Sequence, residues 1–204
     1  TENRDLILLD KNMCAIDKQI RLESVPVFIA ATGSIELDYK IFVACRNGST
    51  YLIKNWKIST SFDVHIESKP VGMIKLEKTL VIAGMNRNVY SFYNKGKINF
   101  TKQMPADITD IQKMQVQSGK LMQLILISLK NGEVRIFNDK YHVHTLTIGE
   151  PISAMKFGIY GREEGCLVIN TDSPVKVDSS ICSPPLRAGP NTTQSAGMLA
   201  MLWA

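Results

Sequence analysis

The chain has 204 residues, of which 45% are hydrophobic and 21% are charged, and its formal net charge is +5. This apolar content is enough for a substantial core and excludes a chain that is disordered throughout. The lysines and arginines are scattered along the sequence, so the net charge favours a solvated surface over a dedicated anion-binding tract. No apolar run is long enough to cross a bilayer as a helix. Because the chain opens at Thr1 without a methionine, we expect its natural amino terminus to lie upstream.

Four cysteines, Cys14, Cys45, Cys166 and Cys182, share no close spacing. A zinc site prefers CxxC-type pairs, and a disulfide framework is expected in small secreted domains. Two of the four lie inside apolar segments, as small buried thiols do. The cysteines therefore predict a reduced, intracellular protein without a metal site.

The predicted strands follow one another with no competing helical pattern. Residues 5–10 and 14–22 predict two strands without partners upstream, the outer half of a four-stranded unit. Three complete units are expected: 25–33, 41–46, 49–53 and 62–67; then 70–77, 79–85, 89–96 and 97–104; then 106–114, 121–129, 133–139 and 141–148. A fourth unit begins with 151–157 and 166–170.

The centre of each complete unit is a predicted hairpin, most clearly LILISLKNGEVRIF at residues 124–137. Asn-Gly tolerates positive φ at both central positions of a tight turn, which makes it the strongest short-range hairpin signal. Asn47-Gly48 and Asn86-Arg87-Asn88 occupy the equivalent places upstream. The tips recur about every 40 to 45 residues, a period typical of propeller blades.

The second strand of each unit is apolar on both faces, whereas the outer strands alternate. This contrast is expected when each sheet is covered by two neighbouring sheets near an axis and becomes exposed towards the rim. The sequence therefore predicts an all-β fold with about three and a half four-stranded blades of a β-propeller. We expect residues 1–172 to form this partial propeller. Residues 173–204, rich in Ser, Pro, Thr and Gly, are expected to form an irregular or disordered tail or to be sequence foreign to the domain.

A charged segment in the last unit, Arg162, Glu163 and Glu164, is the candidate partner-binding site. It lies between two predicted strands, in a turn bounded by Gly158 and Gly165. Two interpretations remain open. The turn either contacts a protein partner or is a solvated loop whose glycines supply positive φ.

Other candidate sites have weaker support. His142 and His144, two apart on a predicted strand, share a face but have no third ligand at a suitable spacing, so no metal site is expected. Asp107 and Asp110 lie near strand ends, yet no nucleophile or histidine follows in an order that predicts a catalytic triad. No catalytic or cofactor-binding residue is therefore predicted.

Aromatic residues recur in or just after the third strands, with basic residues nearby, a combination that can stack nucleic-acid bases. At these positions aromatic side chains more often fill the space between sheets. The residues concerned are Trp56, Tyr90, Phe92 and Phe137, with Lys54, Arg87 and Arg135.

Three strings carry a resemblance beyond the blade period: ACRNG at 44–48, NGEVRI at 131–136 and FGIYGRE at 157–163. With the surrounding sequence, they resemble the amino-terminal propeller of the Bardet-Biedl syndrome 1 protein family, which are BBSome subunits. The resemblance covers residues 1–169 with few gaps.

This resemblance implies a fragment of a seven-bladed propeller in a non-enzymatic subunit of a coat-like complex that carries membrane proteins into and out of cilia. The implied partners are other BBSome subunits, ciliary membrane-protein cargo and a GTP-bound Arf-like small GTPase that recruits the complex to membranes. The implied locations are the cytoplasm, the cilium, its basal body and, peripherally, the ciliary membrane. Neither a cofactor nor nucleic acid is implied.

The family's GTPase surface is built from the first and last blades, and its last blade continues through a glycine-rich turn into another apolar strand. Here Ser173-Pro174-Val175-Lys176 follows instead, so we expect a propeller that does not close by itself. Two alternatives to the scaffold function remain: a propeller-type cofactor-binding enzyme, and a basic RNA-binding propeller whose affinity falls steeply with salt.

Overall fold

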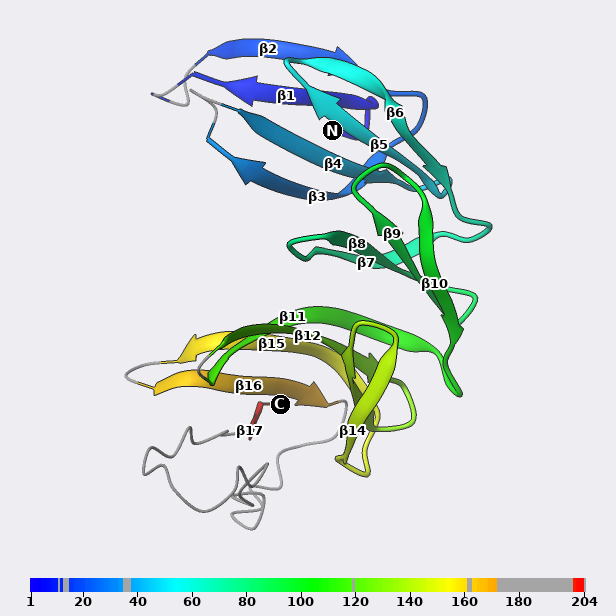
Figure 1. Ribbon diagram of the computed structural model, residues 1–204, viewed down its shortest axis with the longest axis vertical. Helices are drawn as coiled ribbons and strands as arrows, with labels where there is room; N and C mark the ends of the chain where they lie inside the picture. Colours follow the sequence, from blue (N-terminus) through cyan, green and yellow to red (C-terminus); the bar gives the residue numbers. More distant parts are fainter. Residues whose placement is uncertain are drawn as a thin grey trace. The chain divides into compact units, whose positions relative to one another are not determined.

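The computed structural model describes residues 1–10, 12, 15–34, 38–118, 120–160, 163–171 and 200–203, and every regular element in that part of the chain is a β-strand (Figure 1). The chain divides into two compact units, Thr1–Pro105 and Ala106–Ala204. None of the described residues belongs to a helix of the length and apolar character that crossing a membrane requires. The prediction of an all-β partial propeller is confirmed.

The first unit contains one two-stranded and two four-stranded antiparallel sheets, named here sheets 1 to 3. Sheet 1 comprises β1 (Asp5–Leu9) and β2 (Ile16–Arg21). Sheet 2 comprises β3 (Pro26–Gly33), β4 (Tyr39–Cys45), β5 (Ser49–Lys54) and β6 (Lys57–His65). Sheet 3 comprises β7 (Pro70–Lys75), β8 (Thr79–Gly84), β9 (Asn88–Tyr93) and β10 (Ile98–Gln103). These strands confirm the predicted half unit and the first two complete units.

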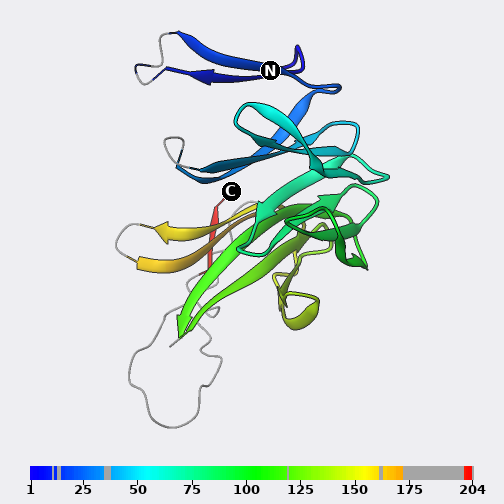
Figure 2. The ribbon, with the colours of Figure 1, turned by 45° about the horizontal axis from the view of Figure 1, so that its top comes forward.

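The second unit contains one four-stranded and one three-stranded sheet, sheets 4 and 5. Sheet 4 comprises β11 (Ile108–Ser118), β12 (Lys120–Leu129), β13 (Glu133–Asn138) and β14 (Tyr141–Thr147). Sheet 5 comprises β15 (Ile152–Tyr160), β16 (Glu163–Thr171) and β17 (Ala200–Trp203). Figure 2 shows the strong twist of these strands and the length of β11 and β12.

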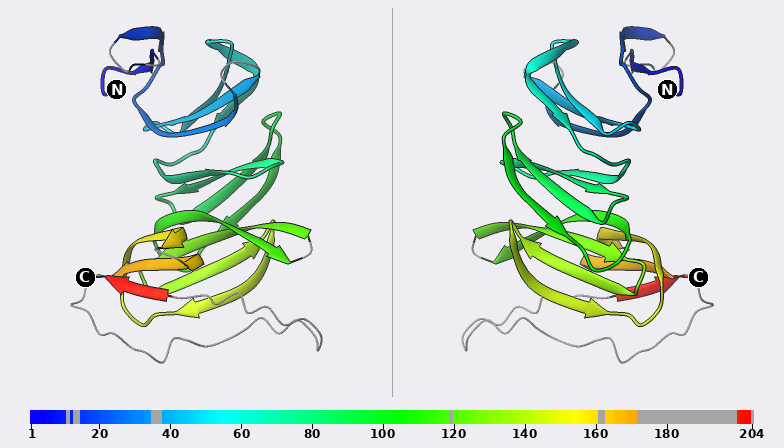
Figure 3. Two further views of the ribbon diagram at one scale, coloured as in Figure 1. Left: turned by 90° about the vertical axis from the view of Figure 1, so that its left-hand side faces the viewer. Right: turned by 90° about the vertical axis from the view of Figure 1, so that its right-hand side faces the viewer.

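The end of the chain differs from the expected irregular tail in one respect. Strand β17 pairs in parallel with β16, from Leu167 opposite Ala200 to Asn170 opposite Trp203, and Figure 3 shows the two strands side by side. Residues 172–199, which carry most of the expected tail and the expected domain boundary, lie outside the described residues.

The hairpins between second and third strands are confirmed, but their turn type differs from the expected two-residue turn. Gly48 N–H donates to the Cys45 carbonyl at 3.0 Å and Gly132 N–H to the Leu129 carbonyl at 3.1 Å. Only the glycine has positive φ, +95° at Gly48 and +84° at Gly132, and the asparagine does not. This three-residue loop is a tight turn followed by a glycine in the left-handed region. The asparagine instead uses its side chain, since Asn131 Oδ1 accepts from Glu133 N–H at 3.3 Å.

Two backbone hydrogen bonds recur in each complete sheet and tie the hairpin to the rest of the sheet. The residue after the second strand donates to a carbonyl just before the first strand, as from Arg46 to Val25 at 2.8 Å. The residue after the fourth strand donates to the turn, as from Ile66 to Gly48 at 3.1 Å. Their counterparts are Met85 to Lys69 and Met104 to Arg87 in sheet 3, and Lys130 to Asp107 and Ile148 to Gly132 in sheet 4. These two hydrogen bonds join the first and fourth strands to the central hairpin in each sheet.

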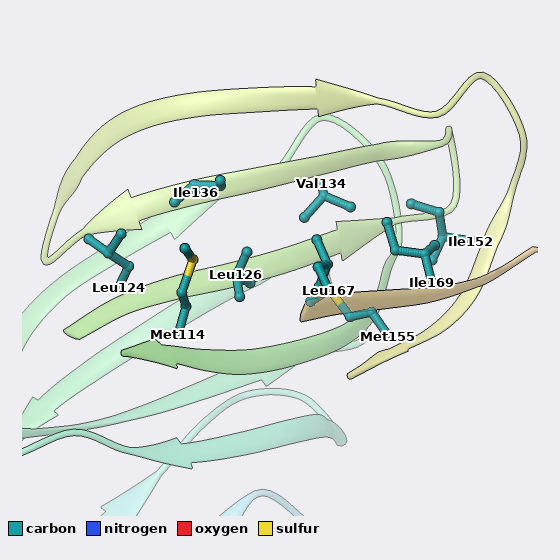
Figure 4. Close-up of a cluster of buried hydrophobic side chains, with 9 residues drawn as sticks. All are labelled: Met114, Leu124, Leu126, Val134, Ile136, Ile152, Met155, Leu167 and Ile169. Atoms are coloured by element: carbon teal, nitrogen blue, oxygen red, sulfur yellow. The ribbon is translucent and has the colours of Figure 1, made fainter. Parts of the chain in front are cut away.

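The core of each unit lies between neighbouring sheets. Sheets 2 and 3 share a cluster that includes Phe42, Phe62, Leu80 and Phe92, in which the Phe42 and Phe62 rings meet edge to face at 5.3 Å. In the second unit, nine buried side chains from β11 to β16 form the cluster in Figure 4. All six residues of β8 are buried, as expected for a second strand covered on both faces.

Candidate partner-binding surface

The predicted site lies at the tip of the β15–β16 hairpin, but the turn is shorter than expected. Tyr160 pairs with Glu163, so the strands extend past Gly158 and Gly165. Gly165 has a φ of +77°, and the pairing register shifts between Gly158 and Tyr160 on the facing strand. Gly165 therefore lies in a β-bulge within the paired strands and not in the turn. Glu163 and Glu164 are therefore the first residues of β16 rather than turn residues.

The structure describes only part of the predicted partner-binding segment. Arg162 lies outside the described residues, and for Glu163 and Glu164 only the backbone is described. The neighbouring side chains on β15 are exposed: Ile159 is 74% exposed and Tyr160 is 39% exposed. The tip thus presents apolar side chains beside the charged segment, and sequence reasoning missed them.

The base of this hairpin is held by a carboxylate that sequence reasoning considered only as a possible catalytic base. Asp110 on β11 accepts a hydrogen bond from Met155 N–H on β15 at 3.1 Å, which links sheets 4 and 5. Its other contacts are with its own strand, from Ile111 N–H at 2.7 Å and from Gln112 Nε2 at 3.3 Å to each carboxylate oxygen. A carboxylate that accepts hydrogen bonds from its own strand and from Met155 N–H positions β15 against sheet 4. Sequence alone gave no signal for this role, because the donor is a backbone group 45 residues away.

The two histidines of β14 do not share a face, contrary to the expectation from their spacing. His142 pairs with Phe137 and His144 pairs with Ile136, because the register shifts between these two pairs. Consecutive residues of β13 point to opposite faces, and so do their partners. His142 lies against the Phe137 ring, with centroids 5.3 Å apart, and its Nε2 is 2.8 Å from Thr145 Oγ1. No group of three potential metal ligands occurs among the described residues.

Most of the aromatic residues that were considered for base stacking are buried or hydrogen-bonded within the sheets. Phe92 and Phe137 are each 3% exposed, and Tyr90 Oη accepts from Asn86 Nδ2 at 2.7 Å. Arg135 Nε lies 3.0 Å from Glu133 Oε2, so its charge is partly compensated. These side chains fill and border the sheets.

The two cysteines in the described residues, Cys45 and Cys166, are buried. Burial raises the pKa of Cys45 to about 11, and the nearby Glu23 carboxylate contributes in the same direction. Such a thiol is protonated at neutral pH and unreactive. Cys14 and Cys182 lie outside the described residues.

A family model described as "Ciliary BBSome complex subunit 1" matches residues 1–54. BBSome complex member BBS1 of Mus musculus is 32% identical over 171 residues, and that of Homo sapiens is 33% identical over the same length. These matches cover 84% of the chain but only 29% of each relative, so the chain spans less than a third of their length.

Solved structures agree with this relationship. A crystal structure of BBS1N in complex with ARL6DN, soaked with mercury, has a TM-score of 0.78 at 32% identity, covering 83% of this chain and 56% of that one. A lead-soaked crystal of the same complex also has a TM-score of 0.78. BamB from Moraxella catarrhalis, with a TM-score of 0.56 at 14% identity, shares the fold alone. Over the region that these matches cover, the chain is a fragment of the amino-terminal β-propeller of the BBS1 family of BBSome subunits.

Proposed function

We propose that the chain contributes part of a non-enzymatic interaction scaffold in the BBSome and that this scaffold binds a small GTPase of the Arf-like class. The observation that carries the proposal is the likeness, at a TM-score of 0.78 and 32% identity, to BBS1N in a crystal with ARL6DN. The likeness in sequence and in fold extends over most of this chain, so a related partner is the simplest expectation for the domain that contains it.

The proposed scaffold works by holding its partners. The GTPase binds in its GTP form and recruits the complex to membranes, where the complex carries ciliary membrane-protein cargo. The protein accordingly acts in the cytoplasm, the cilium and the basal body, and peripherally at the ciliary membrane. Other BBSome subunits bind the remaining surface. The engagement of Asp110 with backbone and amide donors supports a structural rather than a catalytic use of the carboxylate.

The β15–β16 tip is proposed as part of the partner surface. Exposed Ile159 and Tyr160 lie just before Arg162, Glu163 and Glu164 in the sequence. An apolar centre with a charged rim is the usual composition of a protein interface. Asp110 and the buried cluster behind β15 hold the base of the hairpin in place.

Capture of the full chain by immobilised ARL6, locked in either its GTP or its GDP form, tests the proposal. We expect retention on the GTP form alone. Equal retention on both forms, or none on either, would remove this GTPase as a partner of the chain.

A pair of charge-reversed variants tests the tip. Glu163→Lys with Glu164→Lys is expected to weaken capture, because reversed charges at an interface are repelled by the partner groups that they faced. Asp63→Lys with Glu67→Lys makes the same change in net charge at exposed positions of the first unit and serves as the control. If the two double variants are captured equally well, the tip is not part of the interface.

A further inference from the structure

The sheets of the first unit have two different ends. The connection between β6 and β7, residues 66–69, joins the end of sheet 2 that carries the Gly48 turn to the end of sheet 3 that carries the Arg87 turn. These two turns therefore lie on one side of the unit. The β5–β6 and β9–β10 turns lie on the opposite side, called here the outer-turn end.

Exposed apolar side chains gather at the outer-turn end. Ile58 is 40% exposed, Tyr93 is 44% exposed and Ile98 is 60% exposed, and each lies within one or two residues of the β5–β6 or β9–β10 turn. The other exposed large apolar residues of sheets 2 and 3, within the described part, are Met85 at the opposite end and Val27 and Ile29 on β3. Ile58 is the second residue of β6 and Ile98 is the first residue of β10, and these two strands are the equivalent outer strands of sheets 2 and 3.

Lysines flank the same side chains. Lys57, Lys95 and Lys97 are exposed, and Lys54 is half-buried. Lys78 is exposed on the neighbouring β7–β8 turn. Among the described residues at this end of the two sheets, the acidic side chains are Glu77 and Asp38, and the latter lies 3.9 Å from Lys40 Nζ. The end therefore combines an excess of positive charge with protruding apolar side chains.

One aromatic residue at the outer-turn end, Trp56, is not among these exposed apolar side chains. Trp56 packs against the buried cluster that includes Leu6, Val43 and Ile53, and its ring centroid lies 6.3 Å from that of Tyr39. The exposed apolar side chains are those of Ile58 on β6, Tyr93 on β9 and Ile98 on β10, beside two separate turns.

We propose that the outer-turn end of the first unit binds an anionic lipid surface. Lysine ammonium groups attract acidic headgroups, and aliphatic and tyrosine side chains between them enter the interfacial region. A bilayer presents acidic headgroups over a wide area and can contact the lysines and apolar side chains beside both turns at once, whereas a folded acidic protein would need a surface that matches each turn. This contact requires no GTPase, so it is tested separately from the proposed function.

Flotation of the full chain with phosphatidylcholine vesicles, with and without phosphatidylserine, tests the proposal. We expect binding only when phosphatidylserine is present, and we expect added salt to weaken it. Lys95→Glu with Ile98→Ser is expected to weaken binding roughly tenfold or more, since each lysine near such a surface contributes measurably to affinity.

Lys69→Glu with Met85→Ser is the matched control, because both residues are exposed at the opposite end and the changes in charge and apolar surface are alike. Both variants should melt like the parent chain. Equal weakening by the two variants would overturn the proposal, as would binding that ignores phosphatidylserine. Binding to polyglutamate but not to vesicles would assign the surface to an acidic protein instead.

Discussion

Gly132 occupies a backbone conformation that only glycine adopts without strain. Its φ is +84°, and a Cβ atom there would lie 2.7 Å from the Glu150 carbonyl oxygen. Gly132→Ala should therefore lower the free energy of unfolding by about 2 kcal/mol or more, from left-handed strain and steric overlap together. Chemical denaturation of the second unit measures this loss.

The equivalent position in sheet 3 supplies the control. Arg87 already adopts a φ of +65° with a full side chain. Arg87→Gly exchanges backbone strain for greater freedom of the unfolded chain, so stability should change by no more than about 1 kcal/mol. A Gly132→Ala variant as stable as the parent would mean that the turn conformation is wrong.

Asp110 distinguishes a structural carboxylate from a catalytic one. Asp110→Ala removes the acceptor for Met155 N–H and should destabilise the second unit by about 1 to 3 kcal/mol, the usual cost of an unpaired buried group. The exposed Asp63 is the control, and Asp63→Ala should stay within about 0.5 kcal/mol of the parent. Matching melting curves for the two variants would show that Asp110 does not hold the sheets together.

At the scale of single strands, β16 gives the sharpest test. Ile169 is fully buried in the cluster of Figure 4, between strands of two sheets. Ile169→Arg would place an unpaired charge there and should cost at least about 3 kcal/mol, enough to unfold the second unit. Asn170→Arg introduces the same residue at the next, exposed position and should be tolerated. Normal melting of the Ile169→Arg protein would contradict the placement of β16 in the core.

The strands themselves could be predicted because their apolar patterns are continuous or alternating over whole segments. The hairpin predicted at residues 80–92, for example, is formed by β8 and β9, although its turn contains no glycine. Local register could not be predicted. A bulge at Val143 moves His144 to the opposite face from His142, and a bulge near Ile159 shortens the candidate turn. One extra residue in a strand leaves no clear mark in composition but reverses every side chain beyond it.

For the whole chain, the part of β3 that sheet 1 leaves uncovered predicts self-association. Ile29 on β3 is 57% exposed and lies opposite Val43, whose side chain packs in the cluster shared with the two-stranded sheet 1. Exposed apolar strands next to open sheet edges promote association between molecules. Val27→Thr with Ile29→Thr should therefore shift the chain towards monomer in sedimentation velocity experiments.

The control for the β3 variant is a substitution at Ile98, which is exposed on the outer strand β10. Ile98→Thr removes similar apolar surface without touching β3 and should leave the association unchanged. A chain that is already monomeric at high concentration would refute the role given to the β3 face.

The sequence by itself determined the all-β class, the order of the strands, the blade repeat and the family, because these depend on hydrophobic periodicity and on strings of residues that persist along the chain. Tertiary structure alone decided that Asp110 joins two sheets, that the β14 histidines face apart and that lysines and apolar side chains meet at one end of the first unit. The physical reason is that each of these depends on strand register and on neighbours distant in sequence, which local residue preferences do not encode.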